Sequence, residues 1–165
     1  MTPGVRNGLI VAALHLAIVG GLAGKLLVDR ATRPRVWARA APVDPELPIR
    51  GRYLRLRIEA TPAPGLDRPV PLGARVALSV EDGTLVASPD ADSRLDVRIA
   101  ERDGARVAVL QQPLAYFIPE HVPDPSVRGA GEELWVEVTL PRRGAPRPIR
   151  LGVRRDGVVM PLALD

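Results

Sequence analysis

The sequence contains no cysteine, a single lysine and few aromatic residues, namely two Trp, two Tyr and one Phe among 165 residues. The absence of cysteine excludes disulfides, thiol nucleophiles and thiolate-bound metals. So few aromatic rings cannot supply the stacking surface typical of nucleic-acid binding, and we expect no nucleic-acid partner. Hydrophobic residues nevertheless make up 46% of the chain, which is enough for one folded domain with a short appendage.

The formal net charge of +4 is unevenly distributed along the chain. Residues 1–40 contain six basic residues and one acidic residue, whereas residues 41–165 contain 17 basic and 18 acidic residues. The larger part of the chain is therefore close to neutral. The positive excess lies around the longest apolar stretch, where charges also influence insertion into a membrane.

The apolar stretch has no charge from Gly8 to Gly24, and Lys25 is followed by three more apolar residues. A helix over residues 8–28 would be about 30 Å long, which matches the hydrocarbon core of a bilayer. We therefore predict a short tail over residues 1–7 and a single transmembrane helix over 8–28, with the bilayer as a partner. A cleaved signal peptide is the alternative interpretation.

The flanking charges give opposing indications of orientation. Residues 25–40 contain five basic residues, which under the positive-inside rule favours a cytoplasmic domain. A short tail ahead of a first apolar segment commonly stays inside while the following domain is exported. We expect the domain that follows the helix to lie outside the cytoplasm.

The chain after the helix divides into a linker and a β-rich domain. Several prolines and arginines predict a juxtamembrane linker over residues 29–49. From residue 50 to 165 the apolar residues alternate with polar ones, as in Leu54, Leu56 and Ile58, which is the period of a half-buried strand.

The dipeptide Asp-Gly occurs three times, each time between two alternating segments. Because both residues tolerate positive φ, Asp82-Gly83, Asp103-Gly104 and Asp156-Gly157 each predict a β-hairpin. With three further segments, the chain would contain seven to nine strands. The predicted fold is mainly β, a compact antiparallel β-barrel or β-sandwich.

Two short segments resemble the conserved motifs of a known bacterial family. The first block comprises Pro42, Asp44, Pro45, Gly51, Arg52, Tyr53 and Leu56, and the second comprises Tyr116, Phe117, Pro119 and Glu120. On these residues the chain resembles the GDYXXLXY family of membrane-anchored β-rich proteins. It departs from the family pattern at Arg52, Ile58 and His121, which stand where the family has Asp, Tyr and Gly. Glu132 or Glu133 would match a later family glutamate.

The resemblance implies a bacterial protein of the cell inner membrane, because the family is associated with multi-pass membrane proteins. It implies no reaction. If the family Asp were a metal ligand or a general acid, Arg52 would abolish that chemistry in this chain.

The remaining candidate sites each have a structural alternative. Arg50, Arg52, Arg55 and Arg57 form an arginine stripe that could bind anionic headgroups or an acidic partner, or could be the solvated face of a strand. Glu120 and His121 could form half of an acid–base or metal site, or belong to a solvated loop. No serine lies in a recognisable nucleophile motif, and the sole lysine, which would be the base of a Ser–Lys hydrolase, lies in the apolar segment.

We therefore expect a non-catalytic, single-pass protein without a cofactor or a metal, whose β-domain binds or stabilises a multi-pass membrane protein. A ligand- or ion-binding module centred on residues 116–121 is the first alternative, and a hydrolase is the second.

Overall fold

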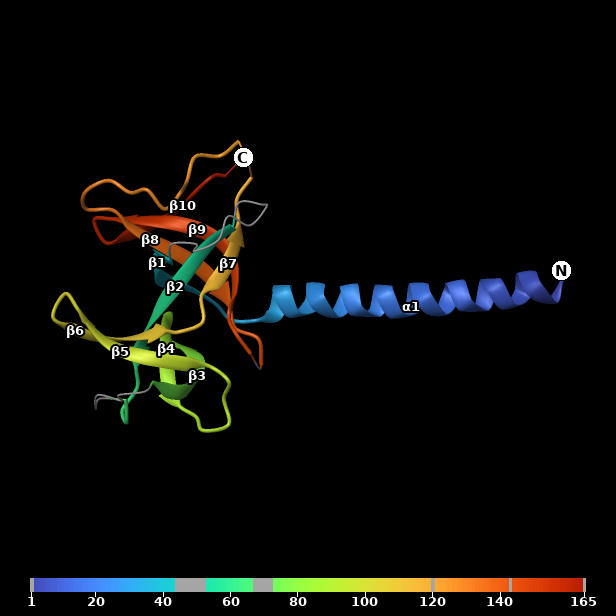
Figure 1. The fold of residues 1–165 in the computed structure, drawn as a ribbon, viewed down its shortest axis with the longest axis horizontal. Coiled ribbons are helices and arrows are strands. Elements are labelled where there is room, and N and C mark those ends of the chain that lie inside the picture. Colours follow the sequence, from blue (N-terminus) through green and yellow to red (C-terminus); the bar gives the residue numbers. More distant parts are fainter. Residues whose placement is uncertain (1, 44–52, 67–72, 120, 143, 165) are drawn as a thin grey trace. The chain divides into compact units, whose positions relative to one another are not determined.

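The computed structural model describes residues 2–43, 53–66, 73–119, 121–142 and 144–164. The chain forms two compact units, Met1–Arg33 and Pro34–Asp165 (Figure 1). The first unit consists of a helix and the second of strands, so the predicted division into an apolar helix and a mainly β domain is confirmed.

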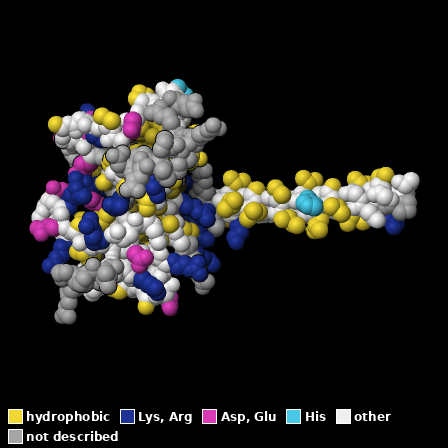
Figure 2. Space-filling model, viewed as in Figure 1, with side chains coloured by type: hydrophobic (Ala, Val, Ile, Leu, Met, Phe, Trp, Pro, Cys, Tyr) yellow, Lys and Arg dark blue, Asp and Glu magenta, His cyan; other side chains and the backbone are white. Residues whose placement is uncertain are grey.

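Helix α1 extends over Pro3–Thr32 and is apolar on all sides. Within it, Gly4–Val28 is long and apolar enough to cross a membrane, and its large apolar side chains are exposed (Figure 2). A helix of this kind could be a membrane anchor or a signal sequence. The helix begins at Pro3 rather than at the predicted residue 8, so it includes most of the segment over residues 1–7 that was expected to be a tail.

The described residues of the second unit form ten strands, compared with the seven to nine that the sequence predicts. They are β1 (Arg35–Val43), β2 (Tyr53–Pro62), β3 (Ala74–Glu81), β4 (Thr84–Pro89), β5 (Asp96–Arg102), β6 (Ala105–Leu110), β7 (Leu114–Phe117), β8 (Glu133–Thr139), β9 (Arg147–Arg155) and β10 (Val158–Pro161).

Strand β1 corrects the predicted linker. Helix α1 continues to Thr32, and Arg35–Val43 is a strand rather than a proline-rich connection. Its alternate residues Val36, Ala38 and Ala40 are buried, and it pairs with β8 and β2. The linker prediction is wrong for these residues because their inward side chains are small and Trp37 interrupts the apolar alternation. Residues 44–49 lie outside the described part of the chain.

The strands form one sheet in the order β10-β9-β8-β1-β2-β4-β3-β5-β6, and β2 also pairs with β6 and β7. The pairings from β2 through β4, β3, β5 and β6 therefore return to β2 and close a ring. Among the described pairings, only that of β2 with β4 is parallel. Strand β2 is part of this ring and also pairs with β1 and β7. It therefore connects the two halves of the β-unit, which are the ring and the part that contains β7, β1, β8, β9 and β10.

The three Asp-Gly hairpins are confirmed. They join β3 to β4, β5 to β6 and β9 to β10. At the first turn the φ angles of Asp82 and Gly83 are 48° and 74°, and the other two turns have the same pattern. Two successive positive φ angles match the twist of paired strands, which explains why this dipeptide recurs.

The core lies between the inward faces of the strands in both halves of the β-unit. Its most completely buried large side chains are Leu56, Ile58, Leu66, Leu110, Leu151, Val76, Val97, Val136 and Val138. Leu56 and Ile58 belong to β2, so this strand also supplies core residues at the junction of the two halves.

Candidate functional site

The two motif segments lie side by side as strands β2 and β7. Their antiparallel register places Tyr53 opposite Phe117, Leu54 opposite Tyr116 and Leu56 opposite Leu114. On its other side β2 pairs with β1, where Pro42 of the first motif lies opposite Leu56. Segments about 60 residues apart in the sequence thus form three adjacent strands.

The period-two alternation divides the motif residues between two faces. Leu54 and Leu56 are buried, Tyr116 packs partly buried against the core, and Ile118 is buried. Burial raises the pKa of the Tyr116 hydroxyl, because the charged form loses hydration. These inward residues contribute to the core, whereas the outward residues Tyr53, Arg55 and Phe117 are exposed.

Tyr53 and Phe117 form an exposed aromatic pair on the outer face. Their ring centroids are 5.6 Å apart with an interplanar angle of 68°, which is an edge-to-face arrangement. The two residues remain 52% and 56% exposed, respectively. Most of this aromatic surface is therefore in contact with solvent in the isolated β-unit.

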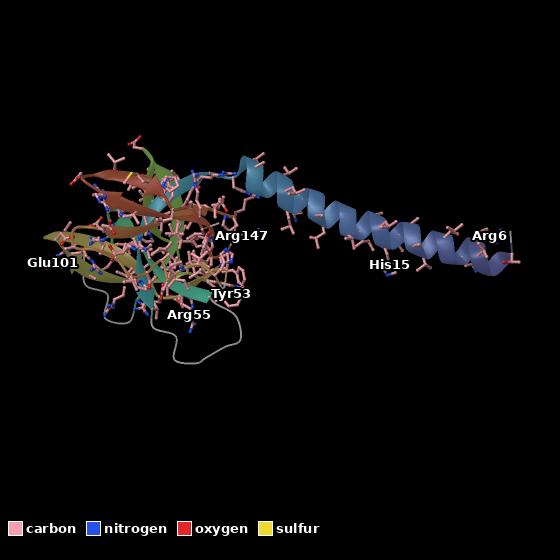
Figure 3. All side chains as sticks on the ribbon, turned by 90° about the horizontal axis from the view of Figure 1, so that it is seen from above. Arg6, His15, Tyr53, Arg55, Glu101 and Arg147 are labelled. Atoms are coloured by element: carbon pink, nitrogen blue, oxygen red, sulfur yellow. The ribbon has the colours of Figure 1, made fainter. Side chains whose placement is uncertain are left out.

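The arginine stripe is described only in part. Arg55 is exposed and lies near Tyr53 on β2 (Figure 3), and its cross-strand neighbours Val43 and Ala115 are uncharged. No described acidic residue forms an ion pair with Arg55. Arg57 is half-buried, and its Nε is buried without a hydrogen-bond partner in the described part of the chain.

Several predicted residues lie outside the described part of the chain: Asp44, Pro45, Arg50, Gly51, Arg52 and Glu120. His121 is described and is exposed. It directly precedes Val122, whose N–H donates to the Pro119 carbonyl over 3.2 Å. The described residues contain no group of three His, Asp or Glu side chains that could hold a metal ion. The described residues therefore form no three-ligand metal site that includes His121.

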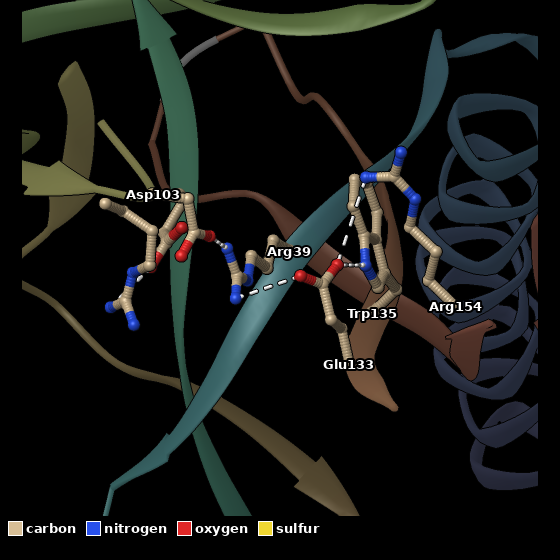
Figure 4. Close-up of polar contacts among 7 residues, drawn as sticks. Arg39, Asp103, Glu133, Trp135 and Arg154 are labelled. Carbon is tan, nitrogen blue, oxygen red and sulfur yellow. Dashed lines mark hydrogen bonds and ion pairs between the residues drawn. The ribbon is translucent and has the colours of Figure 1, made fainter. Parts of the chain in front are cut away.

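A second cluster, which the sequence reasoning missed, is centred on Arg39 (Figure 4). Arg39 Nη1 donates to Asp103 Oδ2 over 2.8 Å, and Arg39 Nη2 lies 3.0 Å from Glu133 Oε1. Glu133 Oε2 accepts from Trp135 Nε1 over 3.2 Å and lies 3.9 Å from Arg154. The hydrogen bond from Arg39 lowers the pKa of Asp103.

The same outer face of β1, β8 and β9 holds a second row of contacts. Arg150 Nε donates to Glu137 over 2.7 Å, and its guanidinium lies 5.4 Å from the ring centroid of Trp37. In the first row, Arg154 lies 5.1 Å from the Trp135 ring. Each tryptophan is thus covered by an arginine that lies near a glutamate. We call this face the paired face.

Period-two spacing was the signal that could have revealed the paired face. Glu133, Trp135 and Glu137 alternate on β8, and Arg150 and Arg154 alternate on β9. What the pattern could not show is that these strands pair in this register. Of the two glutamates that were candidates for the family glutamate, Glu133 belongs to the paired face. Glu132 forms an ion pair with Arg155, which lowers the Glu132 pKa.

No protein-family model matches this chain, and no curated protein or solved structure matches it. The resemblance to the GDYXXLXY family therefore remains an expectation based on the quoted motif residues.

Proposed function

We propose that this protein is a non-catalytic, single-pass protein of the bacterial inner membrane whose β-unit binds a multi-pass membrane protein. The binding surface is the outer face of β2 and β7. The observation that carries the proposal is the exposed pair of Tyr53 and Phe117 next to Arg55, which has no acidic partner among the described residues.

The composition of this surface supports binding. Tyr, Trp and Arg are enriched among residues that dominate interface energies, and large aromatic rings contribute much of the buried area. Full burial of a Phe side chain contributes about 1.5–3 kcal/mol. A partner that covers Phe117 and offers a carboxylate or carbonyl oxygen to Arg55 would use both features.

The helix supports a partner within the membrane. If α1 anchors the chain, the β-unit is confined to the bilayer surface. Confinement raises its effective concentration toward other membrane proteins without any additional contact. A modest binding surface is then sufficient for stable association. The family resemblance points to the same class of partner.

Crosslinking from the aromatic pair tests the proposal. A photoreactive amino acid at Phe117 in the full chain should capture a multi-pass protein in intact membranes. The same probe at Val158, an exposed apolar residue of β10, is the matched control. Repeated recovery of the protein alone, or equal capture from both positions, would contradict the proposal.

Variants of the pair provide a second test. Tyr53→Ser with Phe117→Ser should abolish co-purification of the partner from detergent-solubilised membranes, whereas Val158→Ser should preserve it. Equal partner recovery from the double variant would place the binding surface elsewhere on the protein.

A reporter fused after residue 165 tests the orientation. We propose that the β-unit lies outside the cytoplasm. A reporter that is active only outside the cytoplasm should therefore be active in this fusion. An inactive reporter, together with activity of a cytoplasmic one, would reverse the orientation.

A further inference from the structure

Three exposed arginines gather at one end of the sheet formed by β1, β8 and β9. Arg35 begins β1 and lies opposite Thr139, which in turn lies opposite Arg147 at the start of β9. Arg142 is in the connection between β8 and β9. Since neighbouring strands are about 4.8 Å apart, Arg35 and Arg147 lie about 10 Å from each other. We call Arg35, Arg142 and Arg147 the basic end.

The segments that build the basic end contain no acidic residue. Neither residues 30–43 nor residues 138–155 include Asp or Glu. The opposite end of the same strands is different, because Glu133 lies opposite Arg154 and Glu132 pairs with Arg155. Along β1, β8 and β9 the arginines of the basic end therefore lie away from Glu132 and Glu133, which belong to the opposite end of these strands.

The basic end is also the end to which the helix is covalently attached. Helix α1 ends at Thr32 and β1 begins at Arg35, so only two residues separate them. Three Cα–Cα steps span at most about 11 Å. The backbone of Arg35 thus stays within this distance of the end of the helix in any arrangement of the two units. The Leu140 N–H donates to the Pro34 carbonyl, which ties the β8–β9 connection to the same point.

We propose that the basic end docks on the anionic phospholipid headgroups of the membrane that α1 anchors to. Guanidinium groups bind phosphate oxygens through paired hydrogen bonds, and each arginine near an anionic surface strengthens binding about fivefold. Three arginines together favour the docked state by up to about 100-fold. The inference relies on the anchoring role of α1 and is independent of the aromatic pair.

The absence of cysteine allows a site-specific test in the full chain. Ala145→Cys places one thiol in the exposed β8–β9 connection, and Ala130→Cys places one in the exposed segment before β8. Each variant is labelled with a fluorophore and reconstituted in nanodiscs that contain a headgroup-level nitroxide lipid quencher. Discs with and without phosphatidylglycerol are compared.

We expect strong quenching at position 145 in anionic discs, which falls by at least half in neutral discs or at high salt. Position 130 should show no such dependence. Equal quenching at position 145 in anionic and neutral discs would overturn the proposal.

Charge variants complete the test. Arg35→Gln, Arg142→Gln and Arg147→Gln together should reduce quenching at position 145 to the neutral-disc value. The matched control replaces Arg94, Arg98 and Arg106, three exposed arginines from the β5–β6 region, with Gln and should leave quenching unchanged. Equal loss in both triple variants would show that net charge alone is responsible and would overturn a specific basic end.

The outcome is distinguishable from that of the proposed function. Loss of docking with unchanged partner capture from Phe117 contradicts only the present inference. If alkaline extraction released the chain from membranes, α1 would not be a membrane anchor. That result would overturn both this inference and the part of the proposed function that relies on the anchor.

Discussion

The aromatic residues of the β-unit lie in two regions with opposite surroundings. On the paired face, Trp37 and Trp135 are covered by arginines that themselves lie close to glutamates. On the outer face of β2 and β7, Tyr53 and Phe117 contact each other and are otherwise largely exposed.

The two regions therefore differ in whether their aromatic rings are already covered by charged side chains or are open to solvent. Covered rings and neutralised charges leave little to be gained from a partner, because their interactions are already made. Exposed rings next to an arginine without an acidic partner gain contacts when another surface covers them.

The largest expected effect comes from the inward side of β2, beneath the exposed pair. Leu56 is fully buried between β1 and β7. Leu56→Ala should reduce the free energy of unfolding by about 2–5 kcal/mol through lost burial and a residual cavity. Denaturant unfolding of the full chain in detergent, followed by tryptophan fluorescence, measures it. Leu78→Ala, at a half-buried position of β3, should cost less. A larger loss of unfolding free energy for Leu78→Ala than for Leu56→Ala would contradict the central position of β2 in the core.

On the paired face, Gly152 leaves the space that the Trp37 ring occupies. An added Cβ would lie 2.7 Å and 2.9 Å from two atoms of this ring and 3.0 Å from the Met160 carbonyl oxygen. Gly152→Ala should therefore destabilise the fold by about 1–3 kcal/mol and alter tryptophan fluorescence. Gly129→Ala, where the nearest atoms would be 3.7 Å away, is the control and should be near neutral. A neutral Gly152→Ala would show that Trp37 does not require this space.

The ion pair of Arg39 and Glu133 should show energetic coupling. Both side chains are mostly buried, and the pair joins β1 to β8. A double-mutant cycle of Arg39→Gln and Glu133→Gln should give a coupling free energy of about 1 kcal/mol. The same cycle for Arg155 and Glu132 should give a smaller value, because Arg155 is more exposed. Coupling near zero at Arg39 would mean that the paired face does not stabilise the fold.

Acid should weaken the ion pairs of Asp103 and Glu132. Hydrogen bonds from Arg39 and Arg155, respectively, lower the pKa of these carboxylates in the folded state. The unfolded chain therefore binds protons first, and stability falls as the pH drops from about 5 through the ordinary carboxyl pKa of about 4. Asp103→Asn with Glu132→Gln should flatten the dependence of Tm on pH in this window. Asp156→Asn, at the same turn position as Asp103, is the matched control. An unchanged slope in the double variant would contradict this assignment.

The smallest effect on stability is expected on the outer face of β2 and β7. Tyr53→Ser or Phe117→Ser should change the free energy of unfolding by less than about 1 kcal/mol, which is the scale of one cross-strand aromatic contact. Denaturant unfolding checks this. A loss comparable with that of Leu56→Ala would show that the pair serves folding and would remove the contrast between the two regions.

The sequence predicted those features of the fold that depend on neighbouring residues. The three Asp-Gly turns were recognisable because positive φ at two successive residues requires such side chains. The inward alternation of Leu54, Leu56 and Ile58 was also visible. Strand β1 was missed because its buried residues are small. Its pairing with β2 and with β8, which is remote in the sequence, could not be seen from the residues of β1 alone.

The candidate site was predictable only as two separate segments. Residues of the first and second motif could be selected from the sequence, whereas their pairing as β2 and β7 could not. The arginine stripe was a prediction from the sequence, of which the structure describes Arg55 and Arg57. The basic end was not predicted, because Arg35 and Arg147 are more than 100 residues apart. Only strand pairing through β8 brings them to one end of the sheet.

The sequence by itself thus determined the apolar helix, the β-rich class and the turns, since helix length, residue periodicity and turn conformation are local properties. The tertiary structure decided which aromatic residues are covered and which are exposed, and where positive charge gathers. Those properties depend on the register between distant strands, which is set by the packing of the whole core.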